Sequence, residues 1–247
     1  MAKTSQQAEQ ANPGKARPSI SVFFPCHNEE ENVSRVVAQA VEVAGQISDD
    51  FEVIVVDDGS RDRTGAIADE LAVKDARVRV VHHPTNLGYG AALQSGFRAA
   101  SKGLVFYTDG DAQFDIRELP PLLGLMDEYD IVSCYRRKRQ DNLIRRVNGW
   151  GWTNLVCLLF GMRLRDIDCA FKVYRRDIFD NIKMVSTGAL IDAEILARAV
   201  RKGYTVVQRP VNHYPRESGE QSGASIGVIF RAFKELLQLR RKVLRDE

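Results

Sequence analysis

The feature that most constrains the fold is a repeated alternation of short apolar segments with helix-like segments over residues 19 to 135. The apolar segments are rich in β-branched and aromatic residues and end at polar or glycine-containing breaks, which is typical of buried strands. The expected strands cover 19–25, 51–56, 77–82, 104–108 and 130–135. The expected helices cover 29–45, 64–72, 91–100 and 116–128, with Asn28 as a cap of the first. Such alternation predicts an α/β fold with a mostly parallel sheet and helices on both faces.

Polar breaks follow four of these expected strands, at 28–29, 57–58, 86–88 and 109–111. Ligands of open α/β sheets bind outside the carboxyl ends of the strands, so we expect these breaks to cluster on one rim. The first break is not G-x-G-x-x-G, and no P-loop sequence occurs, which disfavours a dinucleotide redox cofactor and a P-loop enzyme. Carboxylates at strand ends instead indicate contacts to ribose hydroxyls, a base edge and a metal. The alternative for Asp57 and Asp58 is that they only form a turn.

The break after the strand at 104–108 contains two carboxylates, Asp109 and Asp111, separated by Gly110. A tight turn at the glycine can bring both carboxylates to one point. Two converging carboxylates repel each other and need a cation, and oxygen ligands suit Mg²⁺ or Mn²⁺. Gln113 adds a neutral oxygen two residues further on. The alternative is an Asp-Gly turn that closes the strand without a metal.

The composition changes after Tyr135. Residues 136–146 are strongly basic, and 147–164 are apolar with two tryptophans, which indicates either an amphipathic or a core helix. The remaining expected elements are a strand at 166–174, helices at 175–181 and 190–202, and a strand at 204–208. A polar, glycine-rich loop then carries Arg216, an arginine well placed to grip a phosphate.

The last stretch, 226–247, is a basic amphipathic helix. It fits a helix on an anionic membrane surface, or one that packs on the domain or on a partner. The expected domains are therefore a disordered lead (1–18), one α/β domain (19–223) and the C-terminal helix (224–247). No apolar stretch of about 18 residues suggests a membrane span, and the N-terminus lacks the apolar core of a signal peptide. The four cysteines, none of them in a C-x-x-C motif, fit buried thiols in a reducing compartment.

Taken together, these motifs resemble the family-2 glycosyltransferases of the GT-A fold, with the closest likeness to polyprenyl-phosphate (dolichyl-phosphate) hexose transferases. The likeness covers about residues 19 to 222. The matching segments are Phe24-Pro25-x-x-Asn28-Glu29, Val55-Val56-Asp57-Asp58-Gly59-Ser60, Asn86-x-Gly88, Asp109-Gly110-Asp111-x-Gln113, Asp166-x-x-Cys169-x-Phe171-Lys172, Glu194, and Arg216-x-x-Gly219 followed by Ser222. The chain departs from the family in one extra residue between Gly219 and Ser222, and in the lack of the C-terminal transmembrane helices that many relatives carry.

The resemblance implies a role for each matching position. The nucleotide pocket would be lined by Pro25, Asn28, Glu29, Asp57, Asp58, Asn86, Gly88 and Asp109, with Glu29 and Asp58 reaching ribose or base. The metal-binding triplet would be Asp109, Asp111 and Gln113. The acceptor phosphate would face Arg136 and Arg145, with Arg146 as an equal alternative register to Arg145, and Arg216 would hold phosphate in the closing loop.

These assignments lead to the hypothesis of an inverting transferase that moves a hexose from GDP- or UDP-hexose to polyprenyl phosphate. It would act with Mg²⁺ or Mn²⁺ at the cytoplasmic face of an anionic membrane, without a nucleic-acid partner. A lipid phosphate has a second pKa of about 6 and needs arginines to position it rather than a general base. The expected catalytic residues are therefore Asp111, Arg136, Arg145 and Arg216.

Three alternatives stay open at this point. A sugar or small-molecule hydroxyl could be the acceptor, with Asp166, Asp168 or Glu194 as the base. A sugar nucleotidyltransferase is disfavoured because the first strand lacks a glycine-rich phosphate loop. A non-catalytic module that binds nucleotide or a lipid surface would bind nucleotide without turnover.

Overall fold

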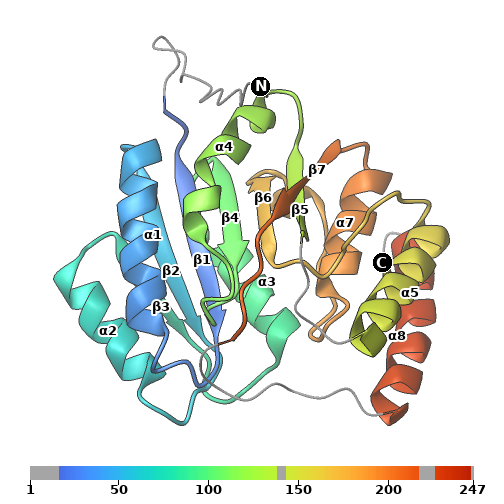
Figure 1. Cartoon of the computed structure of the whole chain (residues 1–247), viewed down its shortest axis with the longest axis horizontal. Coiled ribbons are helices and arrows are strands. Elements are labelled where there is room, and N and C mark those ends of the chain that lie inside the picture. Colours follow the sequence, from blue (N-terminus) through green and yellow to red (C-terminus); the bar gives the residue numbers. More distant parts are fainter. Residues whose placement is uncertain (1–16, 138–142, 217–225, 246–247) are drawn as a thin grey trace, which may run out of the picture.

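The computed structural model of the chain describes residues 17–137, 143–216 and 226–245, with side chains described except at 143–147 and 226–234. A seven-stranded sheet lies at its centre, in the order β3-β2-β1-β4-β6-β5-β7 (Figure 1). Only β6 runs antiparallel to its neighbours, so the sheet is mostly parallel, as the sequence predicts. The strands are β1 (Ile20–Cys26), β2 (Phe51–Asp57), β3 (Val78–His82), β4 (Leu104–Thr108), β5 (Ile131–Arg136), β6 (Phe171–Arg175) and β7 (Val206–Val211).

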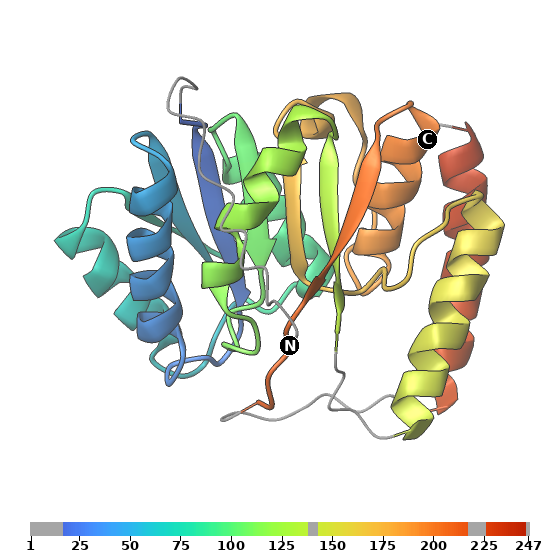
Figure 2. The same cartoon turned by 45° about the horizontal axis from the view of Figure 1, so that its top comes forward.

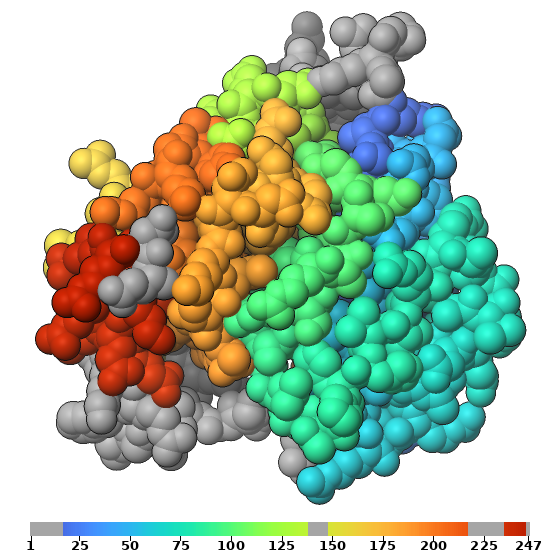
Figure 3. Space-filling model, turned by 180° about the vertical axis from the view of Figure 1, so that it is seen from behind, coloured from blue at the N-terminus to red at the C-terminus, as the bar shows by residue number. Residues whose placement is uncertain are grey.

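Helices cover both faces of the sheet. The helix α1 packs on β1 and β2 together with the short helices around residue 120, whereas α3 packs on the other side with α7 (Figures 1 and 3). The described helical elements are α1 (Val33–Ile47), α2 (Thr64–Lys74), α3 (Tyr89–Ala99), η1 (Ile116–Glu118), α4 (Pro120–Leu123), η2 (Gly124–Asp127), α5 (Leu143–Phe160), α6 (Ile178–Asn181), α7 (Ile191–Arg201) and α8 (Ile226–Arg245). Because both faces are covered, β2 and β4 are buried at every position, as expected of central parallel strands.

The first predicted helix begins later than expected. Asn28 does not cap it: its φ is 57°, and its side-chain oxygen accepts a hydrogen bond from the Arg61 amide at 2.9 Å. The helix starts at Val33, and the three glutamates before it lie outside its first turn. Asn28 tolerates the left-handed conformation better than most residues do, because its short side chain can bond locally. The asparagine therefore joins two loops instead of starting a helix.

Three other predicted elements differ from the expected ones. The helix predicted at 116–128 is divided into two 3₁₀ turns and one α turn, because Pro120 and Pro121 lack amide donors and Gly124 is a weak helix former. The strand predicted at 166–174 forms only from Phe171 onward. The strand predicted at 204–208 continues instead to Val211, and Pro210 is tolerated there because β7 is an edge strand.

The C-terminal helix α8 lies alongside α5 and also contacts α7 (Figure 2). One side of α8 is buried through Leu236, Leu239 and Val243. The Arg240 Nε atom donates to the Leu159 carbonyl of α5 at 3.0 Å. Leu237 and Leu244, beside this buried side, are exposed. None of the helices in the described residues is both long and apolar enough to cross a membrane.

Candidate active site

The four polar breaks meet at one rim of the sheet, as the topology predicts. Asp58 follows β2, and its amide donates to the carbonyl of Cys26 at the end of β1. The break after β4 also lies against β1, since a Cβ atom on Gly110 would be 2.4 Å from the Cys26 Sγ atom and 3.1 Å from the Pro25 carbonyl. Glycine is therefore required at 110 for this close approach. Asn86 is equally close to the second break, with its amide 2.4 Å from a Cβ built on Gly59.

The carboxylates after β2 are occupied by the protein itself. Asp58 accepts the backbone amides of Leu87 and Gly88, each at 2.9 Å, and the Nδ1 atom of His83 at 2.6 Å. Asp57 accepts the amide of Ser60 at 3.1 Å and lies 3.1 Å from the Nδ1 atom of His82. Both carboxylates are buried. The contacts of Asp58 hold the 86–88 break against the end of β2, which is a structural task in addition to any contact with a nucleotide.

The carboxylates after β4 have fewer protein partners among the described residues. Asp109 accepts the Tyr89 hydroxyl at 3.1 Å, and Asp111 accepts the Gln113 amide at 3.0 Å. Burial and the negative charge of Asp111 raise the pKa of Asp109 to about 8. Burial also raises the pKa of Asp111, although the Gln113 amide and the Arg216 charge oppose the rise. Two close carboxylates in such a site disfavour each other's ionisation, so a bound cation would stabilise both.

The loop that carries Arg216 reaches the same place from the C-terminal part of the domain. The Arg216 Nη2 atom forms an ion pair with Glu29 Oε1 at 2.5 Å. Glu29 also accepts the Asn32 side chain at 2.8 Å, and burial raises the pKa of Glu29 despite these two partners. The pair joins residues 187 positions apart in the sequence. An arginine thus lies between the first break and the β4 carboxylates.

Gln113 links the acidic motif to this loop. Its Nε2 atom donates to the Tyr214 carbonyl at 3.0 Å, and its own carbonyl accepts the Tyr214 amide at 2.9 Å. The residue assigned by resemblance to the metal therefore also fixes the segment before Arg216. Gly219 and Ser222, which belong to the same motif, lie outside the described residues.

The donor set fits a hard divalent cation that completes its coordination with a ligand. In the described part of the chain, no group of three or more His, Cys, Asp and Glu side chains is arranged to hold a metal alone. Mg²⁺ is commonly bound by one or two carboxylates together with substrate phosphates and waters. Asp109 and Asp111 supply two carboxylates whose pKa values are raised in the absence of a cation. The residues present therefore fit Mg²⁺ or Mn²⁺ held jointly with a diphosphate.

Of the arginines expected at the acceptor side, the structure describes the side chain of Arg136. Arg136 makes a bidentate ion pair with Asp166, both bonds being 2.8 Å, and this pair is largely buried. The side chains of Arg145 and Arg146 lie outside the described residues. Asp166, predicted as the first residue of a strand, instead pairs with β5 and lies outside β6. Arg136 keeps its charge, because the charge-assisted bonds to Asp166 outweigh burial and raise its pKa.

The three carboxylates considered as bases are not equivalent. Glu194 is fully buried and accepts the amides of Val185 and Ser186 together with the Nε atom of Arg198, so it has a structural role. Asp166 is paired with Arg136. Asp168 is exposed, yet desolvation by the surrounding protein and the charges of Asp192 and Asp166 raise its pKa to about 6. Asp168 is the only exposed carboxylate of the three, and its raised pKa lies near neutrality.

Two groups at the site were given no role in the sequence analysis. The Tyr89 hydroxyl contacts Asp109, and no local pattern around Tyr89 indicates this contact. Behind the rim, the buried Lys172 Nζ atom donates to Tyr107 at 3.0 Å and forms an ion pair with Asp192 at 2.7 Å. Its position in the Asp166-to-Lys172 motif was the only available signal. The lysine charge opposes the rise in the Asp109 pKa.

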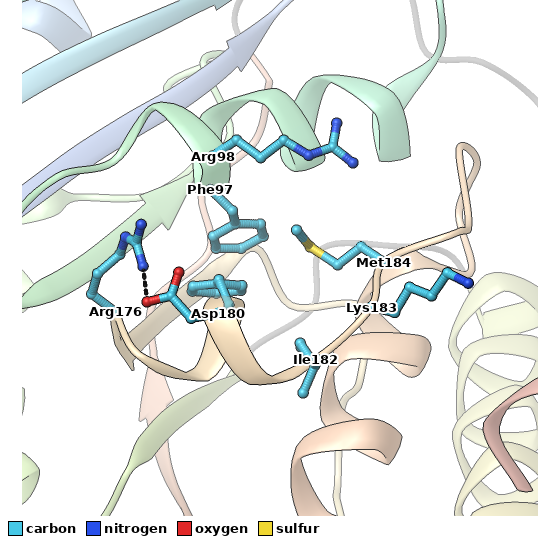
Figure 4. A pocket seen from close by; sticks show the side chains of 8 residues that line it. Phe97, Arg98, Arg176, Asp180, Ile182, Lys183 and Met184 are labelled. Atoms are coloured by element: carbon cyan, nitrogen blue, oxygen red, sulfur yellow. Dashed lines mark hydrogen bonds and ion pairs between the residues drawn. The ribbon is translucent and has the colours of Figure 1, made fainter. Parts of the chain in front are cut away.

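A cavity of about 420 Å³ lies away from this rim, at the C-terminal end of α3 (Figure 4). Its walls include the stacked rings of Phe97 and Phe179 and the ion pair of Arg176 with Asp180. None of the carboxylates of the rim lines it. The chemistry-bearing groups therefore lie at the opposite end of α3 from this cavity.

Comparisons with known proteins show which family the chain is similar to. The sequence profile of glycosyl transferase family 2 matches residues 21–183. The polyprenol monophosphomannose synthase of Mycolicibacterium smegmatis is 30% identical over 241 residues, which cover 90% of this chain and 88% of that protein. Glycosyltransferase AglD of Haloferax volcanii is 34% identical over 80% of this chain, which spans only 33% of that protein's length. An undecaprenyl-phosphate 4-deoxy-4-formamido-L-arabinose transferase of Proteus mirabilis is 30% identical over 85% of this chain and 64% of its own length.

Solved structures show the same architecture. A glucosyl-3-phosphoglycerate synthase from Mycobacterium tuberculosis, crystallised with uridine diphosphate, superposes with a TM-score of 0.67 at 17% sequence identity. The match covers 94% of this chain and 86% of that one. This likeness confirms the GT-A type of α/β fold that the motifs imply. With the match of the family profile, it follows that the chain belongs to glycosyl transferase family 2.

Proposed function

We propose that this protein is a metal-dependent, inverting hexosyltransferase that uses a nucleoside diphosphate sugar as donor and a polyprenyl phosphate as acceptor. The observation that carries the proposal is the meeting of Asp109 and Asp111 with the Glu29–Arg216 pair. This arrangement offers two carboxylates for a cation and one guanidinium for a phosphate. A diphosphate needs both kinds of group.

On the donor side, Asp109 and Asp111 would hold Mg²⁺ or Mn²⁺. Such a cation stabilises the charge that grows on the diphosphate leaving group. Glucosyl-3-phosphoglycerate synthase of Mycobacterium tuberculosis has been crystallised with Mn²⁺ and uridine diphosphate, which supports a divalent cation in this fold. The nucleotide would lie along the first three breaks, near Asn28, Glu29 and Asn86. GDP- and UDP-hexoses are both donors to be tested.

On the acceptor side, the names of similar proteins support a lipid phosphate. The relatives from Mycolicibacterium smegmatis and Proteus mirabilis are named for polyprenol monophosphomannose synthesis and for transfer to undecaprenyl phosphate. A phosphate oxygen would form the new bond to the anomeric carbon while the bond to the diphosphate breaks on the opposite face. This nucleophile needs no general base, and Arg136 and Arg145 would position it, while Arg216 would bind the donor diphosphate.

The outer surfaces of α5 and α8 support attachment to an anionic membrane. Trp150 is 69% exposed and Leu158 81% on α5, and Leu237 is 55% exposed on α8. Exposed cations accompany the apolar residues of α8 at Arg241, Lys242 and Arg245. Apolar side chains among cations favour binding at the surface of an anionic bilayer. The cytoplasmic face is the proposed location, because all four cysteines are free and buried.

A second candidate function, transfer to a sugar or small-molecule hydroxyl, is favoured by one observation. A hydroxyl acceptor needs a general base with a pKa near the working pH. Asp168 has a raised pKa of about 6 and is exposed beside the Arg136–Asp166 pair. In this reading, Asp168→Asn abolishes transfer. In the lipid-phosphate reading, the same variant keeps most of the activity.

The experiment supplies the purified protein with Mn²⁺, radiolabelled GDP- and UDP-hexoses and a short polyprenyl phosphate. The proposal predicts labelled lipid that forms only with the metal and one of the two nucleotide classes. Transfer to soluble sugars alone would favour the second candidate. Nucleotide binding without any transfer would indicate a non-catalytic module.

A further inference from the structure

Tyr89 occupies a specific place beside the proposed cation site. Its hydroxyl donates to Asp109 Oδ1 at 3.1 Å. It is the first residue of α3, whose body packs on β1 and β2. A carboxylate that accepts a hydrogen bond on one oxygen is restricted in its rotation and is better prepared to bind a cation.

The backbone around Tyr89 is fixed by two glycines. Gly88 has a φ of 98°, a left-handed conformation that favours glycine. Gly90 lies against another segment of the chain, since a Cβ atom there would be 2.6 Å from the Gly188 carbonyl oxygen. The amide of Ala91 donates to the Thr187 carbonyl at 3.2 Å. The first turn of α3 therefore rests directly on residues 187–188.

The 185–188 segment is in turn anchored from behind. The buried Glu194 carboxylate accepts the amides of Val185 at 3.1 Å and Ser186 at 2.7 Å. The Gln94 side chain of α3 donates to the Ser186 carbonyl at 2.8 Å. A continuous set of contacts thus runs from Glu194 through this segment to the first turn of α3. The last contact of this set joins the Tyr89 hydroxyl to Asp109.

We propose that Tyr89 is a positioning residue that fixes the Asp109 carboxylate for a divalent cation, and that the 185–188 segment supports it. This inference rests on the proposed function, since it concerns the same cation site. It assigns to Glu194 a supporting role in place of the base considered from the sequence.

The test compares Tyr89→Phe with the wild-type protein. This variant removes one hydroxyl and keeps the ring that packs at the rim. We expect Mn²⁺ affinity, measured by calorimetry with saturating GDP or UDP, to fall by about 10- to 100-fold, as for other partners of metal ligands. The metal concentration for half-maximal transfer should rise by a similar factor. The nucleotide affinity without metal should be unchanged.

Tyr204→Phe is the matched control. It removes a tyrosine hydroxyl that accepts the Asn181 side chain at 3.0 Å, far along the chain from the motif. We expect its Mn²⁺ affinity to equal that of the wild type. A Tyr89→Phe protein with wild-type Mn²⁺ affinity would overturn this inference alone. A wild-type protein that binds no Mn²⁺ with either nucleotide would overturn both the proposed function and this inference.

Gly90→Ala tests the route through the backbone. The added methyl group must displace the first turn of α3 from the Gly188 carbonyl, so Mn²⁺ affinity should fall as it does in Tyr89→Phe. In a protein that already carries Tyr89→Phe, Gly90→Ala should cause little further loss, because the hydroxyl it misplaces is gone. If the double variant loses Mn²⁺ affinity by the full product of the two single losses, the two positions are not coupled through the Tyr89 hydroxyl.

Discussion

Two pairs of aspartates lie at the same rim of the sheet, and they differ in how many protein groups bond to them. Asp57 and Asp58 after β2 are buried and bonded to backbone amides and histidines. Asp109 and Asp111 after β4 have raised pKa values, and the structure describes one hydrogen bond to each. The first pair is stabilised by the protein itself, whereas the second carries unfavourable charge that a cation would relieve in the function we propose. One acidic motif thus builds the rim, and the other is the one we propose for ligand binding.

The largest expected effect concerns the second pair. Asp111→Asn should lower kcat/KM by about 10²- to 10³-fold, the usual size for loss of one group that stabilises transition-state charge. Its thermal stability should not fall, because the substitution removes a charge that raises the pKa of Asp109. Asp115→Asn is a control, since Asp115 pairs with the exposed Arg117 outside the rim. Full activity in Asp111→Asn would contradict a functional difference between Asp109 and Asp111 on one side and Asp57 and Asp58 on the other.

The next effect concerns the first pair. Asp58→Asn keeps the shape of the side chain but turns a donor toward the amides of Leu87 and Gly88 or toward His83. We expect the free energy of unfolding to fall by about 1–3 kcal/mol, the cost of an unsatisfied buried polar group. Urea denaturation measures this change. A stability equal to that of the wild type would show that the Asp58 carboxylate is not needed to build the rim.

The smallest effect is the difference in pH dependence between the wild-type protein and Asp111→Asn, both treated with EDTA. A carboxyl whose pKa is raised from 3.8 to about 8 on folding binds more protons in the folded state, so stability falls as pH rises between these values. The wild-type protein should therefore lose more stability from pH 5 to pH 8 than Asp111→Asn does. Urea denaturation at the two pH values checks this difference. An equal loss of unfolding free energy in both proteins would contradict repulsion between Asp109 and Asp111.

Local sequence patterns predicted much of the fold. The apolar runs that became β1, β2 and β4 are short, β-branched or aromatic, and bounded by polar breaks, so their positions were correct within one or two residues. Parallel strands end on the same edge of a sheet, and this rule alone placed the four breaks together. The prediction of one continuous helix at 116–128 was wrong, because two prolines and a glycine divide this segment into short turns.

Side-chain partners were harder to predict, because they join residues that are distant in sequence. Arg136 meets Asp166 across 30 positions, and Tyr89 meets Asp109 across 20. Glu194 looked like a candidate base until its carboxylate was found to accept two amides and an arginine. Periodicity reports which face of an element is buried, but it does not report which polar groups satisfy one another.

The most direct test of the account is a crystal structure of the protein with Mn²⁺ and the nucleoside diphosphate that it binds, with the cation located by its anomalous signal. We expect one strong peak bound to both Asp109 and Asp111, with the diphosphate between that peak and Arg216. A nucleotide bound without the cation, or a peak distant from these two carboxylates, would contradict it.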